Sequence, residues 1–252
     1  TSKNPLRIVV LGDSIAAGMG IERTADVFPA RLESELTRRG HAAEVLNFAV
    51  SGYNTRQEIE TLKDDALAFS PDVVLLAYCL NDHRPPEAKI VDGLRQQAEG
   101  RVAVAPGAAD RLLTASAVYR LLRYRGAHAG DDALAHLDGE GAAAGVQSAA
   151  AFDELAALGR EHGFETLVAV FPELRSNLAR YPYGNRHRHL AALSAERGFA
   201  HLDLLWAYRE CQANGETNLA LDRYHPSVAG HECAALALAD FLEGGLFQPP
   251  SP

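Results

Sequence analysis

The sequence contains only three cysteines among its 252 residues. They stand at Cys79, Cys211 and Cys233, far apart and without a CxxC pair, so a disulfide framework is not indicated. We expect all three to be free thiols, buried like small apolar side chains. Small disulfide-rich domains are therefore excluded as a class.

Basic residues are also in short supply. The chain has 24 lysines and arginines against 33 aspartates and glutamates, which gives a formal net charge of -9. Because nucleic acids and anionic membrane surfaces bind basic patches, we expect neither as a partner.

Long hydrophobic runs are missing as well. Stretches such as DVVLLAYCL, from Asp72 to Leu80, have the length of buried strands and fall short of the roughly 18 to 20 residues that span a bilayer. We expect no membrane span. The chain starts at Thr1 rather than methionine, so a removed signal peptide is compatible with it, and the compartment, cytoplasmic or exported, stays open.

The chain does have a regular alternation of short apolar runs and longer amphipathic segments. The apolar runs are typical of strands buried on both faces of a parallel sheet, and they cover residues 6–11, 44–48, 72–78, 166–171 and 200–204. The amphipathic segments predict helices at residues 25–39, 55–69, 148–162, 185–197 and 226–242. Alternating elements of this kind predict right-handed βαβ units. We therefore expect one flavodoxin-like α/β domain over residues 1–252, a three-layer α/β/α sandwich with five parallel strands in the order 2-1-3-4-5.

One interval breaks this alternation. Between residues 83 and 145 no strand pattern appears, although residues 112–124 have a helical pattern. Such a length without a strand is uncommon inside a compact domain, so we expect a helical insertion after the third strand. It would either cover the strand ends as a substrate lid or pack elsewhere as a helical excursion.

Ser14 lies in the tripeptide GDS directly after the first expected strand, where α/β sheets place their ligands. A serine in a strand-to-helix turn is also a common helix cap, so the tripeptide alone leaves both roles open. The following stretch lacks GxGxxG and the GK[ST] ending of a phosphate-binding loop. Ala16 stands where a GxSxG lipase elbow has its second glycine, so that fold is disfavoured too.

A nucleophilic serine needs a base, and the base needs a third group that holds its tautomer. Of the ten histidines, only His225 follows an aspartate by three residues, in LDRYH, where Asp222 can reach the imidazole around a turn. Pro226 suits the first position of the last expected helix. The spacing is common by chance, so its weight comes from its place on a loop that enters a helix.

An acyl-transfer site also needs an oxyanion hole, made of donors aimed at the developing charge. Gly52, in AVSGYNT after the second strand, can bring its backbone N–H close to a substrate, and Asn81, in YCLNDH after the third, offers a side-chain amide. Together with the N–H of Ser14 they make three donors. Viewed singly, each is also an ordinary turn or polar-loop residue. Asp13 and His83, beside these positions, are candidate substrate contacts.

Taken in order, four blocks resemble the GDSL or SGNH hydrolase family. They are GDS, a glycine followed by NT after the second strand, ND after the third, and DxxHP before the last helix, and they span Gly12 to Pro226. The resemblance implies a flavodoxin-like fold and the cleavage or transfer of acyl groups on esters and thioesters, with no metal and no other cofactor.

Residue by residue, the resemblance implies Ser14 as nucleophile, His225 as base and Asp222 as orienting acid. Gly52 and Asn81 would complete the oxyanion hole with the Ser14 N–H. We therefore expect a serine esterase or acyl hydrolase that acts on a small-molecule or glycan ester through an acyl-serine intermediate. An acyltransferase with the same triad is the alternative, and a non-catalytic binding module or a nucleotide-binding domain of similar fold is disfavoured.

Two departures from the family pattern are visible. The third block is usually GxND, and here Cys79 takes the glycine position, which would narrow or tilt that loop. Ile15 replaces the usual leucine after the serine, a near-isosteric change. A metal site is not indicated, because His187 and His189 point to different sides of their expected helix and we expect a solvated face there. The sequence indicates no oligomeric state.

Overall fold

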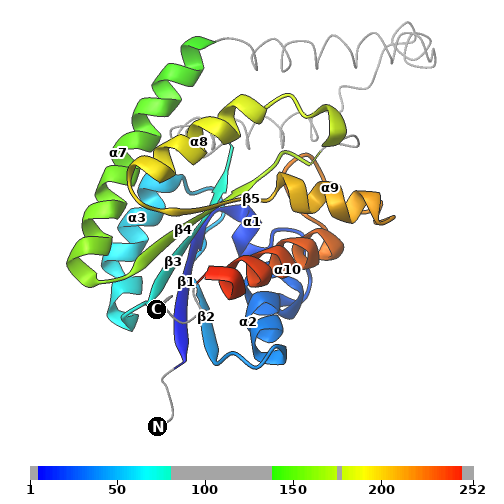
Figure 1. The fold of residues 1–252 in the computed structure, drawn as a ribbon, viewed down its shortest axis with the longest axis horizontal. Coiled ribbons are helices and arrows are strands. Elements are labelled where there is room, and N and C mark those ends of the chain that lie inside the picture. The colour runs from blue at the N-terminus through cyan, green and yellow to red at the C-terminus, as the bar shows by residue number, and fades with distance from the viewer. Residues whose placement is uncertain (1–4, 81–137, 175–177, 246–252) are drawn as a thin grey trace, which may run out of the picture.

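The computed structural model describes residues 5–80, 138–174 and 178–245. They form one sheet of five parallel strands with helices on both faces (Figure 1). The strands are β1 (Leu6–Gly12), β2 (Ala43–Asn47), β3 (Val73–Cys79), β4 (Glu165–Phe171) and β5 (Ala200–Asp203). Their order is β2-β1-β3-β4-β5, which confirms the expected topology, and each strand bound lies within one residue of its expected place.

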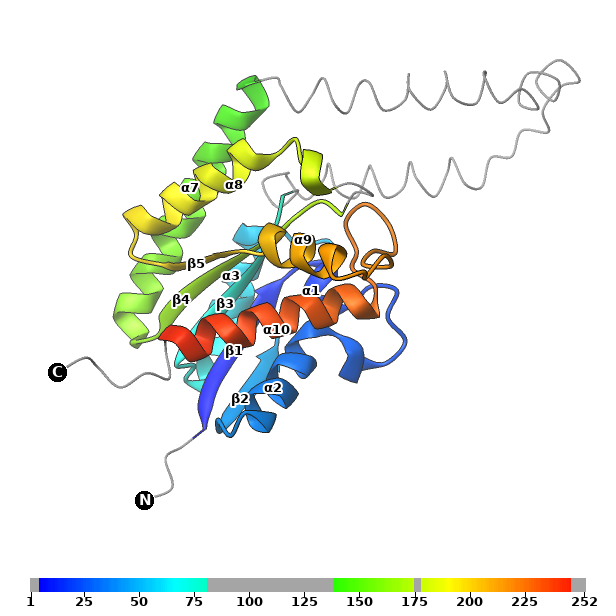
Figure 2. The same ribbon diagram turned by 45° about the vertical axis from the view of Figure 1, so that its right-hand side comes forward.

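The segments around the strands form helices on the two sides of this sheet. These are α1 (Ser14–Ala17), α2 (Phe28–Arg38), α3 (Thr55–Asp64), α7 (Asp138–His162), α8 (Gly184–Glu196), α9 (Leu205–Ala213) and α10 (Val228–Gly245), with 3-10 turns η1 (Thr24–Asp26), η2 (Ala66–Phe69) and η3 (Leu178–Arg180). The helices α3, α7 and α8 cover one face, and α2, α9 and α10 cover the other (Figures 1 and 2). The layers are therefore those of an α/β/α sandwich.

The strand residues explain the two hydrophobic cores. Successive side chains of a strand point to opposite faces, so Ile8 and Val10 pack under α2 and α10, whereas Val9 and Leu11 pack under α3 and α7. All four are fully buried. Burial on both faces is the physical reason for a nearly continuous apolar run in place of an alternating one.

Several helix predictions need correction. The helix expected over residues 25–39 is the 3-10 turn η1 followed by α2, and the helix expected over residues 55–69 is α3 followed by η2. The helix α7 begins at Asp138, ten residues earlier than expected, and α9 was not expected because its apolar start continues the β5 pattern. The last helix begins at Val228 and not at Pro226, since Pro226 is held extended by a bridge to Ala220. The expected insertion falls mostly on residues 81–137, which lie outside the described residues.

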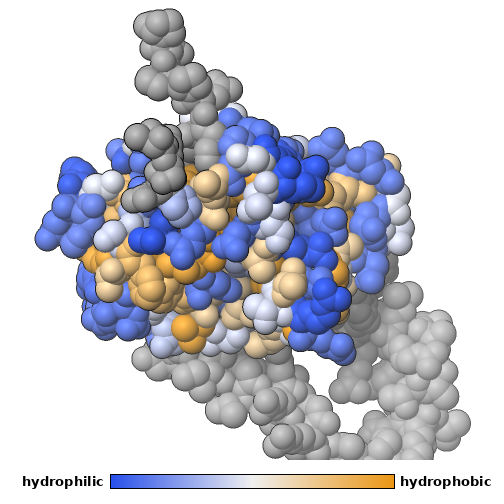
Figure 3. Space-filling model, turned by 90° about the horizontal axis from the view of Figure 1, so that it is seen from below, coloured by the Kyte–Doolittle hydropathy of each residue, from blue (hydrophilic) through white to orange (hydrophobic). Residues whose placement is uncertain are grey.

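The surface mixes polar and apolar side chains. Viewed from below, where the strands begin, hydrophobic patches alternate with hydrophilic ones (Figure 3), as is normal for a folded domain. In the described part of the chain, no helix combines the length and apolar character needed to cross a membrane.

Candidate active site

The turn between β1 and α1 places Ser14 at the carboxyl end of the sheet. Asp13 is the residue that caps α1: its buried carboxylate accepts a hydrogen bond from the N–H of Ile15 at 2.9 Å. Ser14 is therefore the first residue of the helix and not its cap, and it is partly exposed. Its hydroxyl is thus free of the capping role that the tripeptide alone left open.

The structure brings together the three residues expected to form a triad. The Oγ atom of Ser14 lies 2.8 Å from Nε2 of His225, across 211 positions of the chain. On the other side of the ring, Nδ1 of His225 lies 2.7 Å from Oδ2 of Asp222. The second carboxylate oxygen of Asp222 accepts the backbone N–H groups of His225 and Tyr224, at 2.9 and 2.8 Å. Serine, imidazole and carboxylate therefore lie in one hydrogen-bonded line.

These hydrogen bonds fix the charge of Asp222 and the tautomer of His225. Partial burial alone would raise the pKa of Asp222, but hydrogen bonds from the backbone and ring of His225 and from Tyr224 lower it below its usual value. An ionised carboxylate can only accept hydrogen bonds, so Nδ1 of His225 carries a proton. In the neutral ring Nε2 is then an acceptor and faces the hydroxyl of Ser14.

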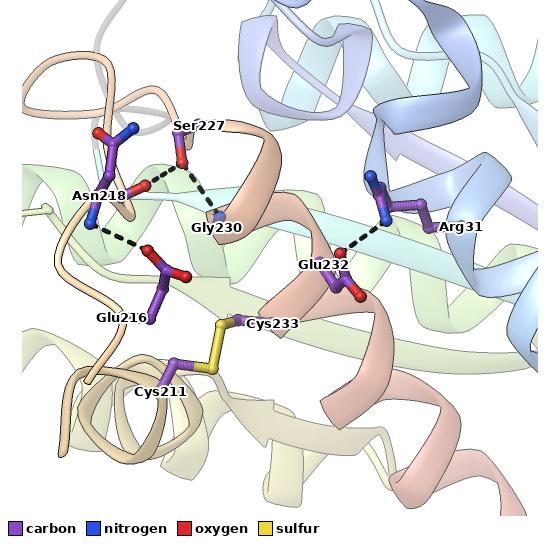
Figure 4. Close-up of a disulfide and its surroundings, with 8 residues drawn as sticks. All are labelled: Arg31, Cys211, Glu216, Asn218, Ser227, Gly230, Glu232 and Cys233. Carbon is purple, nitrogen blue, oxygen red and sulfur yellow. Dashed lines mark hydrogen bonds and ion pairs between the residues drawn. A yellow bond between two sulfur atoms is a disulfide. The ribbon is translucent and has the colours of Figure 1, made fainter. Parts of the chain in front are cut away.

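Asp222 and His225 lie on a loop, residues 219–227, that leads into α10. The N–H of Leu221 donates to the carbonyl of His225 at 2.8 Å, and that of Ser227 donates to the carbonyl of Leu219 at 3.0 Å. These bonds close the loop like a short hairpin. Ser227 then caps α10, because its Oγ accepts the N–H of Gly230 at 3.3 Å, while its hydroxyl donates to the carbonyl of Asn218 (Figure 4).

A disulfide between Cys211 and Cys233 joins α9 to α10 behind this loop (Figure 4). The expectation of three free thiols is therefore wrong for this pair. The two helices pack against each other, which brings the Cα atoms of two residues 22 positions apart to 6.5 Å, a usual distance for a disulfide. Cys79, at the end of β3, is buried and forms no disulfide, as expected.

Gly52 lies in the turn after β2, at the same end of the sheet as Ser14. The N–H of Val50 donates to the carbonyl of Gly12 at 3.0 Å, which ties this turn to the end of β1. Gly52 has φ +88°, a left-handed conformation that favours glycine, and among the described residues no atom would lie within 4 Å of a side-chain carbon placed there. Asn81 and His83 lie outside the described residues.

Sequence patterns did not reveal a second pair of a histidine and a carboxylate, formed by His187 and Asp203. His187 is buried in the structure, so the expected solvated face is wrong for it, whereas His189 is exposed. The Nδ1 atom of His187 lies 2.8 Å from Oδ1 of Asp203, and its Nε2 lies 3.0 Å from the hydroxyl of Tyr181. Within the described residues, no three His, Cys, Asp or Glu side chains are arranged to hold a metal ion.

Comparisons with solved structures agree with this architecture. The crystal structure of TesA superposes with a TM-score of 0.57 at 18% identity, covering 94% of this chain and 98% of that one. Axe2, an acetylxylan esterase from Geobacillus stearothermophilus, superposes with a TM-score of 0.60 at 17% identity, covering 95% and 94%. At such identities the likeness shows a shared fold.

Sequence comparison adds one curated relative and one family. An acetylxylan esterase of Xylanibacter ruminicola is 33% identical over 104 residues, which are 38% of this chain and 21% of that protein. This chain thus matches only about a fifth of its relative's length. The model of the GDSL-like Lipase/Acylhydrolase family matches residues 10–233, from β1 to the middle of α10. The chain therefore belongs to the GDSL-like lipase/acylhydrolase family, as its four sequence blocks led us to expect.

Proposed function

We propose that this protein hydrolyses carboxylic esters through an acyl-serine intermediate. The observation that carries the proposal is the line of hydrogen bonds from Ser14 through His225 to Asp222, at 2.8 and 2.7 Å, in a chain of an acylhydrolase family. Nucleophilic catalysis by a serine needs this order of hydroxyl, imidazole and carboxylate.

In the first step the hydroxyl of Ser14 attacks the ester carbonyl, and Nε2 of His225 takes its proton. The Oγ–carbon bond forms, the bond to the leaving alcohol breaks, and His225 returns the proton to that alcohol. Water then repeats the sequence on the acyl-serine, with His225 again as base, and releases the acid. Asp222 stabilises the imidazolium that forms in each step.

The negative charge on the carbonyl oxygen requires donors. We assign them to the N–H groups of Ser14 and Gly52 and to the side-chain amide of Asn81. The left-handed turn at Gly52 supports its part. If Asn81 donates to the oxyanion, Asn81→Ala should lower kcat on the order of 100- to 1,000-fold.

Two features bear on the substrate. The curated relative is an acetylxylan esterase, which supports an acetylated glycan as one candidate. The exposed apolar side chains Met19, Val50 and Leu221 lie close in sequence to Ser14, Gly52 and Asp222 respectively, which supports a longer acyl group as the other. A panel of p-nitrophenyl esters of rising chain length, run beside acetylated xylo-oligosaccharides, separates these substrates.

The test of the proposal is Ser14→Ala. The variant should lose roughly 10,000-fold or more in kcat on p-nitrophenyl acetate, because nothing else in the line can form the acyl intermediate. A fluorophosphonate should label Ser14 of the wild type. Retention of more than a few percent of the activity by Ser14→Ala would refute the assignment.

An acyltransferase is the second candidate, since it uses the same residues. Product analysis with an added acceptor alcohol decides between the two. Transfer would give the acylated alcohol in excess of the free acid, and hydrolysis would give the acid.

A further inference from the structure

Arg223 lies between Asp222 and His225 in the loop of residues 219–227, here called the catalytic loop. Its side chain turns toward the segment that follows β4. Its Nε atom lies 2.6 Å from Oε2 of Glu173, and its Nη2 lies 2.7 Å from the hydroxyl of Tyr183. Its backbone carbonyl accepts the N–H of Leu174 at 2.7 Å. The tip of the loop is thus bonded to the carboxyl end of β4 by both side chain and backbone.

The two side chains of this ion pair differ in burial. The side chain of Glu173 is only 6% exposed, whereas that of Arg223 is 30% exposed. Solvent screens an ion pair with a buried carboxylate only weakly, so Glu173 favours a conformation of the loop that presents Arg223 to it. Burial alone would lower the pKa of Arg223, but the hydrogen bond and charge of Glu173, together with the electrostatic effects of Tyr224 and Tyr183, raise it above its usual value. Arg223 therefore keeps its positive charge in this contact.

Glu173, the partner of Arg223, is itself held in place by a series of hydrogen bonds. The N–H of Glu173 donates to the oxygen of Tyr181 at 3.0 Å, so the hydroxyl proton of Tyr181 is free to be donated to Nε2 of His187 at 3.0 Å. Nδ1 of His187 then donates to Asp203, at the end of β5. Burial disfavours loss of the Tyr181 proton and raises its pKa. This series of bonds connects Glu173 to the edge of the sheet and gives Arg223 a fixed anchor.

The loop needs such an anchor because its internal bonds do not reach the sheet. The bonds from Leu221 to His225 and from Ser227 to Leu219 keep its shape, but they join residues of the loop to one another and not to the strands of the sheet. A shift of about 1 Å between reacting groups can cost on the order of 100-fold in rate. The contacts of Arg223 oppose such a shift, because they join the tip of the loop to the segment that follows β4.

We propose that Arg223 and Glu173 form a positioning pair that holds His225 at bonding distance from Ser14. The inference rests on the proposed function and adds two residues that touch neither the substrate nor the reacting atoms. It assigns to Arg223 a role in kcat and none in binding the ester.

The experiment compares the wild type with Arg223→Gln, Glu173→Gln and the double variant. We expect each single change to lower kcat for p-nitrophenyl acetate about 10- to 100-fold with KM within about threefold, and the double variant to lose no more than the worse single one. Arg223→Lys can keep the ion pair but not the second bond to Tyr183, so it should recover part of the loss. The rate at which a fluorophosphonate labels Ser14 should fall in parallel.

A matched control removes an arginine whose ion pairs lie away from the three residues Ser14, His225 and Asp222. Arg39 joins α2 to α10 through Asp240 and Glu243, at 2.6 and 2.9 Å. Arg39→Gln should lower thermal stability as much as the Arg223 variant does, yet leave kcat and the labelling rate unchanged at 25 °C. This separates a positioning effect from a general loss of stability.

Hydrogen–deuterium exchange of residues 219–227 tests the anchor without any catalysis. Exchange of these amides should rise in Arg223→Gln and not in Arg39→Gln. An unchanged kcat and unchanged exchange would overturn the inference, and so would a rise in KM alone. If wild-type Ser14 neither reacts with the fluorophosphonate nor hydrolyses any ester of the panel, the proposed function fails, and the exchange result still decides whether the pair holds the loop.

Discussion

Ser14 and His225 form one hydrogen bond, but the two regions that supply them are held by different kinds of contact. The turn of Ser14 follows β1, a strand inside the sheet, and Gly12 before it lies so close to Ala77 of β3 that a side-chain carbon would come within 3.1 Å. The loop of His225 lies outside the sheet, and besides its backbone hydrogen bonds it is held by an ion pair and by a disulfide behind it.

The comparison shows where the site depends on individual residues. Backbone bonds and a buried strand fix Ser14, the proposed nucleophile, so its position is a property of the fold. His225 and Asp222, the proposed base and its carboxylate, depend in addition to backbone bonds on a few side-chain contacts, each of which one substitution can remove. Substitutions in or around the loop of His225 should therefore change catalysis or local stability while the sheet stays intact. We take them from the largest expected effect to the smallest.

The largest effect is expected from Asp222→Asn. The amide can donate to Nδ1 of His225, which stabilises the tautomer with the proton on Nε2, and that ring cannot accept the proton of Ser14. We expect kcat for p-nitrophenyl acetate to fall about 1,000- to 10,000-fold while the fold persists. Asp153→Asn is the control, since Asp153 is an exposed ion-pair partner of Arg197 and should leave kcat unchanged. An Asp222→Asn variant with a tenth of wild-type kcat would contradict the assigned role.

The next largest effect concerns the disulfide. Replacing Cys211 and Cys233 together by serine should lower the free energy of unfolding by about 3 kcal/mol, because the bond closes a loop with a sequence separation of 22 that includes Asp222 and His225. Urea unfolding measures the loss. A reductant should destabilise the wild type but not the double variant, which serves as the control. If mass spectrometry found both thiols free in the wild type, the disulfide would be refuted.

A third change tests the close packing between α10 and the loop. In Gly230→Ala the new methyl group would lie 2.2 Å from the carbonyl oxygen of Leu219, so either the start of α10 or the loop must shift. We expect a loss of about 2 to 3 kcal/mol in the free energy of unfolding, together with a lower kcat. Gly244→Ala, in the last turn of the same helix, meets nothing within 4 Å and should change neither. Equal behaviour of the two variants would show that this packing does not position the loop.

The sequence predicted the sheet, and it indicated that Ser14, His225 and Asp222 would lie together. Buried parallel strands leave continuous apolar runs, and strand ends gather at one edge, so Ser14 and Gly52 could be placed near each other. The start of α10 was wrong because Pro226 fits a first helical turn as well as it fits the extended bridge that it forms.

Other contacts could not be predicted because they join elements without any local pattern. Nothing near Glu173 or Arg223 in sequence indicates a bond across 50 positions. The disulfide likewise depends on how α9 packs on α10, and α9 itself was not expected. His187 and Asp203 are 16 positions apart on different elements. Each of these contacts joins single residues of different elements. The ion pair and the disulfide are the contacts that hold the loop of His225, whereas the strands of the sheet place Ser14.

The smallest expected effect is a pH dependence that arises where α10 meets α2. His231 is buried, and its Nδ1 accepts the N–H of Phe28 at 3.3 Å. Burial and the nearby positive charge of Arg31 lower its pKa to about 4. The unfolded chain, with an ordinary imidazole pKa near 6.5, therefore binds the proton more readily, so stability falls as the pH falls below about 6.5 and levels off near 4.

This dependence is measurable because one substitution removes it. In His231→Gln the free energy of unfolding should change about 2 kcal/mol less between pH 7 and pH 5 than in the wild type. His189→Gln is the matched control, because His189 is exposed on α8 and should leave the pH dependence as it is. If His231→Gln and His189→Gln gave the same curve, His231 would not be the group whose protonation weakens the helix that supports the catalytic loop.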